Sequence, residues 1–131
     1  MKRCIFVDDS SVIRKVAKRI LNGPEMIFIE AGSGIDAIEM CQADMPDIVV
    51  IDSALPDLPT VDVIRRIRAI PSAIVPHIVV CLTEKDVATI MRAKRAGAQS
   101  YLLKPFNRAQ LLERFRAIDI AAQSSAPTQA A

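Results

Sequence analysis

Five short apolar segments, rich in valine and isoleucine, alternate along the chain with longer segments in which apolar residues return every three or four positions. The short segments cover residues 4–7, 26–29, 48–51, 77–82 and 100–103. Apolar runs of this length are typical of strands buried on both faces, and the longer spacing is typical of amphipathic helices. The alternation predicts an α/β fold of five β-α units, with a parallel sheet covered by helices on both sides.

Capping residues mark several helix ends. Thr60 is expected to be the N-cap of the third helix. The fourth helix should run over about 86–96 and end at Gly97, and the fifth should open with a capping-box-like pair, Asn107 and Gln110. The apolar face of the first helix comprises Val12, Ile13, Val16, Ala17, Ile20 and Leu21. The fifth helix should point inward with Leu111, Leu112, Phe115 and Ile118.

The chain has 131 residues, which suits one domain with a sizeable core. From about residue 122 onward it contains no bulky apolar side chain. We therefore expect a folded domain over residues 1–121 and a disordered tail over residues 122–131.

Composition narrows the class of protein. Hydrophobic residues make up 51% and charged residues 24%, and the net charge of +2 is too small to indicate nucleic-acid binding by itself. No apolar run is long enough to cross a membrane, and the N-terminus does not have the pattern of a secretory signal. The three cysteines show no C-x-x-C spacing, so we expect packed, reduced thiols and a cytoplasmic protein.

Polar residues that could bind a ligand or react follow the predicted strands. In an open parallel sheet the binding site lies beyond the carboxyl ends of the strands, so these residues should converge at one edge. They are Asp8 and Asp9 after the first strand, Asp52 after the third, Thr83 after the fourth, and Lys104, followed by Pro105, after the fifth.

Three carboxylates at one edge repel one another, and a divalent cation removes that conflict. Mg²⁺ favours carboxylate, water and phosphate oxygens, so the cluster predicts a magnesium site. The hydroxyl of Thr83 and the amine of Lys104 predict a second, anionic group beside the cation. That group could be a phosphoryl group carried by Asp52, because a carboxylate can act as a nucleophile and form an aspartyl-phosphate.

Four short motifs carry a resemblance to a known family. They are VDD at residues 7–9, ID followed by ALP at 51–56, LT at 82–83 and LLKPF at 102–106. Over residues 2 to about 120 the chain resembles the receiver domain of two-component response regulators, of the stand-alone, chemotaxis-type (CheY-like) class. The resemblance implies a doubly wound, flavodoxin-like (βα)5 fold with strand order 2-1-3-4-5.

The resemblance also implies roles for individual residues. Asp52 would accept the phosphoryl group, and Asp8, Asp9, Asp52 and the backbone carbonyl of Ala54 would hold Mg²⁺. Thr83 would be the switch hydroxyl, Lys104 the amine that senses the phosphate, and Tyr101 the aromatic whose rotamer reports the state. The Lys104–Pro105 peptide bond would be cis.

The implied function is that of a phosphorylation switch. A histidine kinase or phosphotransfer protein would donate the phosphoryl group from a phosphohistidine, and the chain would catalyse only its own phosphorylation and dephosphorylation. Phosphorylation would change the face formed by the helix at 86–96, the strand at 100–103 and the helix that follows, and a downstream target protein would bind there. We expect neither DNA nor membrane binding, and no motif supports a nucleotide second messenger.

Some residues depart from the family pattern. Pro59 and Thr60 stand where an acidic residue and a glycine are usual, which should stiffen that loop, and Glu84 stands where a small residue is usual. Asp57 is interpreted as a loop residue, and His77, which has no evident partner, as structural.

Two other functions remain open. A haloacid-dehalogenase-type phosphatase also forms an aspartyl-phosphate, but its D-x-D signature differs from the spacing in VDDSS. A receiver-like interaction module that is never phosphorylated would usually lack an aspartate or the lysine, and all are present here.

Overall fold

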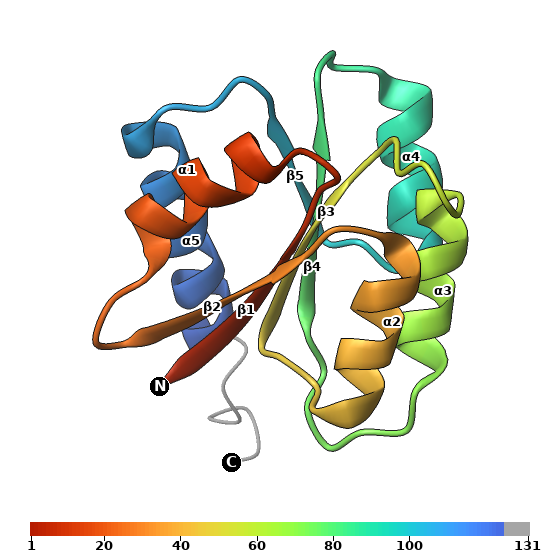
Figure 1. Ribbon diagram of the computed structural model, residues 1–131, viewed down its shortest axis with the longest axis horizontal. Coiled ribbons are helices and arrows are strands. Elements are labelled where there is room, and N and C mark those ends of the chain that lie inside the picture. Colours follow the sequence, from red (N-terminus) through yellow and green to blue (C-terminus); the bar gives the residue numbers. More distant parts are fainter. Residues whose placement is uncertain (125–131) are drawn as a thin grey trace.

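In the described part of the chain, five parallel strands form one sheet, and five helices cover it in two layers (Figure 1). The structure is a computed structural model and describes residues 1–124. The strands are β1 (Lys2–Val7), β2 (Met26–Ala31), β3 (Ile48–Asp52), β4 (His77–Leu82) and β5 (Ser100–Leu103). The helices are α1 (Ser11–Leu21), α2 (Gly34–Ala43), α3 (Thr60–Ala69), α4 (Val87–Ala96) and α5 (Arg108–Ser124).

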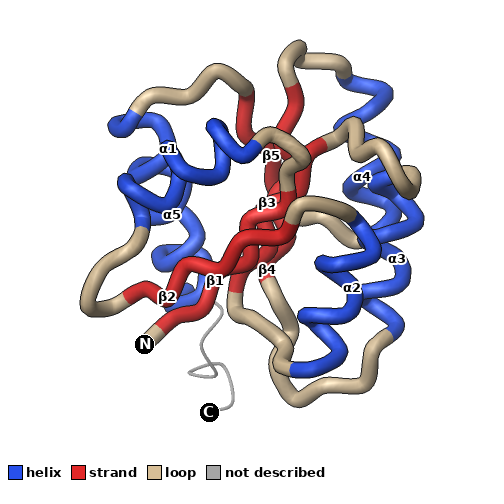
Figure 2. The backbone as a smooth tube through the Cα atoms, viewed as in Figure 1, coloured by secondary structure: helices blue, strands red, loops and turns tan. Residues whose placement is uncertain are grey.

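The strands lie in the order β2-β1-β3-β4-β5 (Figure 2). Every neighbouring pair is parallel. The order and the regular β-α alternation confirm the doubly wound, flavodoxin-like fold predicted from the sequence. The carboxyl ends of β1 and β3 lie side by side at the centre of the sheet, since Val7 pairs with Ile51. This pairing brings the residues that follow the two strands to the same place.

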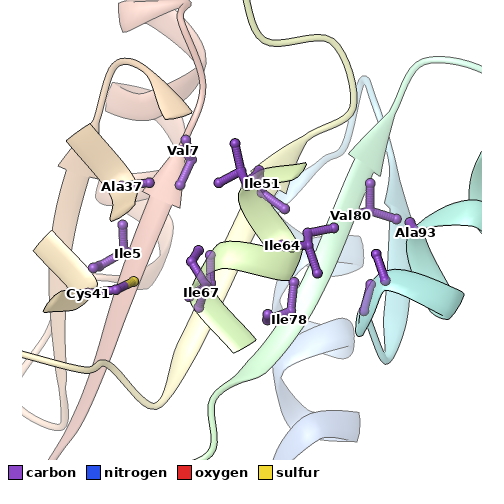
Figure 3. Close-up of a cluster of buried hydrophobic side chains, with 14 of the residues drawn as sticks. Ile5, Val7, Ala37, Cys41, Ile51, Ile64, Ile67, Ile78, Val80 and Ala93 are labelled. Atoms are coloured by element: carbon purple, nitrogen blue, oxygen red, sulfur yellow. The ribbon is translucent and has the colours of Figure 1, made fainter. Parts of the chain in front are cut away.

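The core is divided by the sheet into two clusters, because successive strand residues point to opposite faces. One cluster, which includes Ile5, Ile51 and Val80, packs against α2, α3 and α4 (Figure 3). The other, which includes Phe6 and Val50, packs against α1 and α5. The three cysteines are free and buried, which confirms that they are packed thiols.

Several helix boundaries agree with the sequence patterns. Gly97 is the C-cap of α4 and has a φ of 129°, a conformation that favours glycine. At the start of α5, Asn107 and Gln110 form a reciprocal pair: each side chain accepts a hydrogen bond from the other residue's backbone N–H, at 2.9 and 2.8 Å. The capping box is therefore confirmed.

The prediction that Thr60 is an N-cap is wrong. Pro59 occupies the N-cap position of α3 and makes no side-chain capping bond, and Thr60 is the first residue of the helix. Helix α5 continues through Ser124, past residue 121, where the sequence predicted the end of the domain. The rest of the predicted tail, 125–131, lies outside the described residues.

Three apolar residues predicted to face inward are exposed. On α1 the exposed fractions of Val12 and Val16 are 70% and 41%, while Ala17 and Leu21 are buried. On α5 the exposed fraction of Leu112 is 38%. Each helix therefore carries an apolar face that is wider than the sheet covers. Within residues 1–124, no helix has the length and apolar character that a bilayer crossing needs.

Candidate functional site

Three carboxylates meet where β1 and β3 end. Asp8, Asp9 and Asp52 each offer an oxygen, and these oxygens lie within 4.8 Å of one another. Asp8 and Asp52 are buried, with exposed fractions of 1% and 7%, and Asp9 is exposed. The predicted convergence of the three carboxylates is therefore confirmed. Carboxylate oxygens are the ligands that Mg²⁺ prefers, so the donor set fits this ion.

Lys104 lies between two of these carboxylates. Its Nζ is 2.7 Å from Asp52 Oδ1 and 3.0 Å from Asp8 Oδ2, and its side chain is 12% exposed. Burial alone would lower the pKa of Lys104, but hydrogen bonds to Asp52 and Asp8, together with their negative charges, outweigh burial and raise this pKa above its usual value. The ammonium group thus neutralises charge at the site. The Lys104–Pro105 peptide bond is cis, as the resemblance implied.

Arg14 holds the turn that carries Asp8 and Asp9. One of its guanidinium nitrogens donates to the backbone carbonyl of Asp8 at 2.6 Å, and its Nε donates to Glu30 Oε1 at 3.0 Å. Burial raises the pKa of Glu30, but the hydrogen bonds and charges of Arg14 and Lys15 bring it below its usual value. Glu30 therefore stays ionised and keeps Arg14 in place. The sequence patterns gave Arg14 no role at this site, so this contact was missed.

The loop between β3 and α3 is tied to the acceptor strand at both ends. The backbone N–H of Ala54 donates to Asp52 Oδ2 at 3.2 Å. At the far end of the loop, the hydroxyl of Thr60 donates to the backbone carbonyl of Asp52 at 2.6 Å. The carbonyl of Ala54, expected as a magnesium ligand, therefore belongs to a closed loop that begins and ends at Asp52.

Asp57 pins the middle of the same loop to α2. Its two carboxylate oxygens accept hydrogen bonds from the backbone N–H groups of Gly34 and Ile35 at 3.0 and 2.9 Å. These bonds lower the pKa of Asp57, because they favour the charged carboxylate at a helix N-terminus. Asp57 is a loop residue, as interpreted, but its side chain also caps a helix more than twenty positions earlier.

The predicted switch residues lie on two sides of β5. Thr83 follows β4, is exposed, and lines a groove together with Lys104. Tyr101 on β5 is partly buried, and the Lys85 ammonium and the Arg114 guanidinium each lie 5.9 Å from the centre of its ring. Tyr101 lines a different groove, with Arg114 of α5. Thr83 thus lines the same groove as Lys104, and Tyr101 lines a separate groove.

His77 lies at the other end of β4, away from the acidic site. Its Nε2 is 3.0 Å from the hydroxyl of Ser100, and burial together with the positive charges of Arg68 and Arg114 lowers its pKa. This environment is consistent with a structural histidine.

Comparison with known proteins decides the family. The chain matches the response regulator receiver domain over residues 4–116. It belongs to this family. The receiver domain is 34% identical to the chemotaxis protein CheY of Thermotoga maritima over 115 residues, which cover 86% of the chain and 92% of that protein. It is also similar to a solved signal receiver domain from Bermanella marisrubri, with a TM-score of 0.76 and 32% identity over 88% of this chain and 95% of the other.

A second type of relative is longer than this chain. The transcriptional regulatory protein CseB of Streptomyces coelicolor is 33% identical over 87% of the chain, but the match covers only 47% of CseB. The chain therefore spans about half the length of that relative. Family membership places this receiver domain in two-component signalling and favours this function over that of a haloacid-dehalogenase-type phosphatase.

Proposed function

We propose that this receiver domain accepts a phosphoryl group on Asp52 from a phosphohistidine, in a reaction that requires Mg²⁺. The observation that carries the proposal is the position of Asp52, a nearly buried carboxylate that pairs with the Lys104 ammonium and lies beside the other two aspartates. An oxygen of Asp52 forms the new bond to phosphorus as the bond from phosphorus to the donor's imidazole nitrogen breaks. The receiver then needs only to position the groups and to stabilise charge.

Asp8, Asp9, Asp52 and the backbone carbonyl of Ala54 would hold the ion. When bound, Mg²⁺ supplies positive charge that stabilises the phosphoryl oxygens. Lys104 is already positioned beside Asp52 and can exchange its carboxylate partners for a phosphoryl oxygen, since an ammonium forms strong bonds with phosphate. Thr83 can donate its hydroxyl to another phosphoryl oxygen.

A groove beside the site provides a surface for the donor. It has a volume of about 450 Å³ and runs from Val12 and Val16 on α1 to Thr83, Lys104 and Phe106. The two valines are one helical turn apart and are exposed. An amphipathic helix of the donor that packs in this groove would bring its histidine close to Asp52. The exposed valines are therefore assigned to donor binding rather than to the core.

The surface of α4, β5 and α5 is the proposed output. It contains the exposed apolar residues Val87, Met91 and Leu103, together with Tyr101. Phosphorylation that draws Thr83 toward Asp52 would rearrange the start of α4 and free space for Tyr101, which changes this surface. A downstream target protein would bind one arrangement more tightly than the other.

Labelling with radioactive acetyl phosphate in the presence of Mg²⁺ tests the acceptor. Asp52→Asn should abolish labelling, and Asp57→Asn, in the same loop but bonded to α2, should retain it. Removal of Mg²⁺ with a chelator should also abolish labelling of the wild-type protein. Undiminished labelling of the Asp52→Asn protein would contradict the proposal, and an unlabelled wild-type protein would favour the interaction module that is never phosphorylated.

The donor groove needs a separate test. Val12→Glu and Val16→Glu should each slow transfer from a phosphorylated histidine kinase about tenfold, because each loses the burial of an apolar side chain. Labelling by acetyl phosphate should be unchanged, since a small donor needs no groove. Val75→Glu, at an exposed valine in the loop before β4, is the matched control. Equal transfer rates for all three variants would remove the groove from the proposal.

A further inference from the structure

Thr60 is the first residue of α3, and its hydroxyl bonds to a group outside the helix. A threonine at the N-cap position would usually accept a hydrogen bond from a helix N–H group, which stabilises the helix end. In α3 the hydroxyl instead donates to the backbone carbonyl of Asp52 at 2.6 Å, and the helix has no side-chain cap. Thr60 is 7% exposed, so this bond lies within the protein. The hydroxyl thus serves the acceptor strand rather than its own helix.

This bond completes the fixation of one peptide group. The peptide between Asp52 and Ser53 donates its N–H to the carbonyl of Cys81 on β4 at 2.8 Å, and its carbonyl accepts from Thr60. A peptide group is planar, so bonds on both sides set the orientation of the whole plane. That plane helps to set the direction of the Asp52 side chain. It also sets the path of the backbone from Asp52 to Ala54.

The Asp52 carboxylate is held by groups on both of its oxygens. Its Oδ2 accepts the N–H of Ala54, and its Oδ1 contacts Lys104. Without the Thr60 hydroxyl, the Asp52 carbonyl would lose a buried partner, and the peptide plane could rotate toward another donor. A rotation there would move both the acceptor oxygen and the carbonyl of Ala54.

We propose that Thr60 is a positioning residue for phosphoryl acceptance, which acts through the Asp52–Ser53 peptide group on both the acceptor oxygen and the magnesium ligands. The inference rests on the proposed function of Asp52. Groups that orient metal ligands commonly change metal affinity by about 10- to 100-fold when they are removed. A loss of this kind is expected for the Thr60 hydroxyl, and not for its methyl group.

Four proteins distinguish the effect of the Thr60 hydroxyl from that of its methyl group. They are the wild type, Thr60→Ser without the methyl group, Thr60→Val without the hydroxyl, and Thr60→Ala without either. Mg²⁺ affinity is measured by calorimetry on the unphosphorylated proteins, and the rate of labelling by acetyl phosphate is measured at saturating Mg²⁺. Thr60→Val and Thr60→Ala should bind Mg²⁺ about tenfold more weakly and label about tenfold more slowly. Thr60→Ser should stay close to the wild type in both.

Urea unfolding of each variant distinguishes positioning from simple stability. If Thr60→Val and Thr60→Ala lose stability but keep wild-type Mg²⁺ affinity and labelling, the inference is overturned. If Thr60→Val does not fold, the Ser and Ala variants still decide, because they differ only in the hydroxyl. A wild type that neither binds Mg²⁺ nor accepts phosphate would overturn the proposed function and the inference together. If the wild type binds Mg²⁺ and is labelled, and the variants do so equally well, only the inference about Thr60 is overturned.

Discussion

The loop that follows β3 and the loop that follows β4 border the same site but are held in different ways. The first is bonded to β3 through Thr60 and to α2 through Asp57. The second, residues 83–86, is exposed throughout, and its hydrogen bonds run within the loop and into the first turn of α4. One side of the site is fixed and can position the acceptor, while the other has few bonds to break and can respond to it.

The two ends of α4 show a similar difference. The far end of α4 is anchored by Arg68 of α3, which donates to the carbonyl of Gly97 at 3.1 and 2.7 Å and to the carbonyl of Pro76 at 2.8 Å. The near end of α4 follows the exposed loop 83–86, and its first residue, Val87, is 65% exposed. A response to phosphorylation would therefore move the beginning of α4 more than its end.

Lys104 pairs with carboxylates at the ends of β1 and β3, and its removal is expected to have the largest effect. Lys104→Met leaves the buried carboxylates of Asp8 and Asp52 without their cation, which should lower the free energy of unfolding by about 3 kcal/mol in the absence of Mg²⁺. Urea unfolding measures this loss, and Lys94→Met, on the exposed side of α4, is the control. Added Mg²⁺ should restore part of the stability. Equal stability of the two variants would show that the Lys104 ammonium does not stabilise the buried carboxylates.

The response of the looser side should depend on Thr83 and Tyr101. Thr83→Ala and Tyr101→Ala should still be labelled by acetyl phosphate. Each should reduce the phosphorylation-induced shift between conformations about tenfold, which corresponds to about 1.4 kcal/mol. Hydrogen exchange of the segment 83–103 before and after labelling measures the shift, and Ser11→Ala, with an exposed hydroxyl on α1, is the control. An undiminished change in exchange for both variants would mean that the signal leaves by another route.

The fixed side should loosen slightly when Asp57 is removed. Asp57→Ala takes away the bonds to Gly34 and Ile35 and should cost about 1 kcal/mol of stability at neutral pH. The pKa of Asp57 is lower in the folded protein than its ordinary value of 3.8, so its contribution is present above that value and is lost as the pH falls through the folded pKa. The difference in unfolding free energy between Asp57→Ala and the wild type should therefore shrink in acid. Glu39→Ala, on the same helix, is the control and should show no such pH-dependent change in unfolding free energy. A difference between Asp57→Ala and the wild type that does not depend on pH would exclude the charged cap.

The sequence was sufficient for the features that follow from burial and topology. Apolar runs predicted the strands, and the convergence of parallel strand ends predicted that Asp8, Asp52 and Lys104 would meet. The pairing of Lys104 with two carboxylates at once could not be predicted, because it depends on side-chain directions at three strand ends.

The roles of Thr60 and Asp57 could not be predicted, because their partners are set by the path of a loop. Thr60 was interpreted from its neighbours in sequence, while its hydroxyl bonds to a residue eight positions earlier. Val12 and Val16 show another limit, since periodicity reveals an apolar face but not how much of it the sheet can cover.

The position of Tyr101 gives the protein its own spectroscopic probe. The chain contains one tyrosine and no tryptophan, so almost all of its ultraviolet fluorescence comes from this ring. The ring lies between Lys85, in the looser of the two loops, and Arg114 of α5. A change in emission when acetyl phosphate is added would therefore report on this surface alone. The kinetics of activation can be followed in the unmodified protein, without a dye and without knowledge of its target.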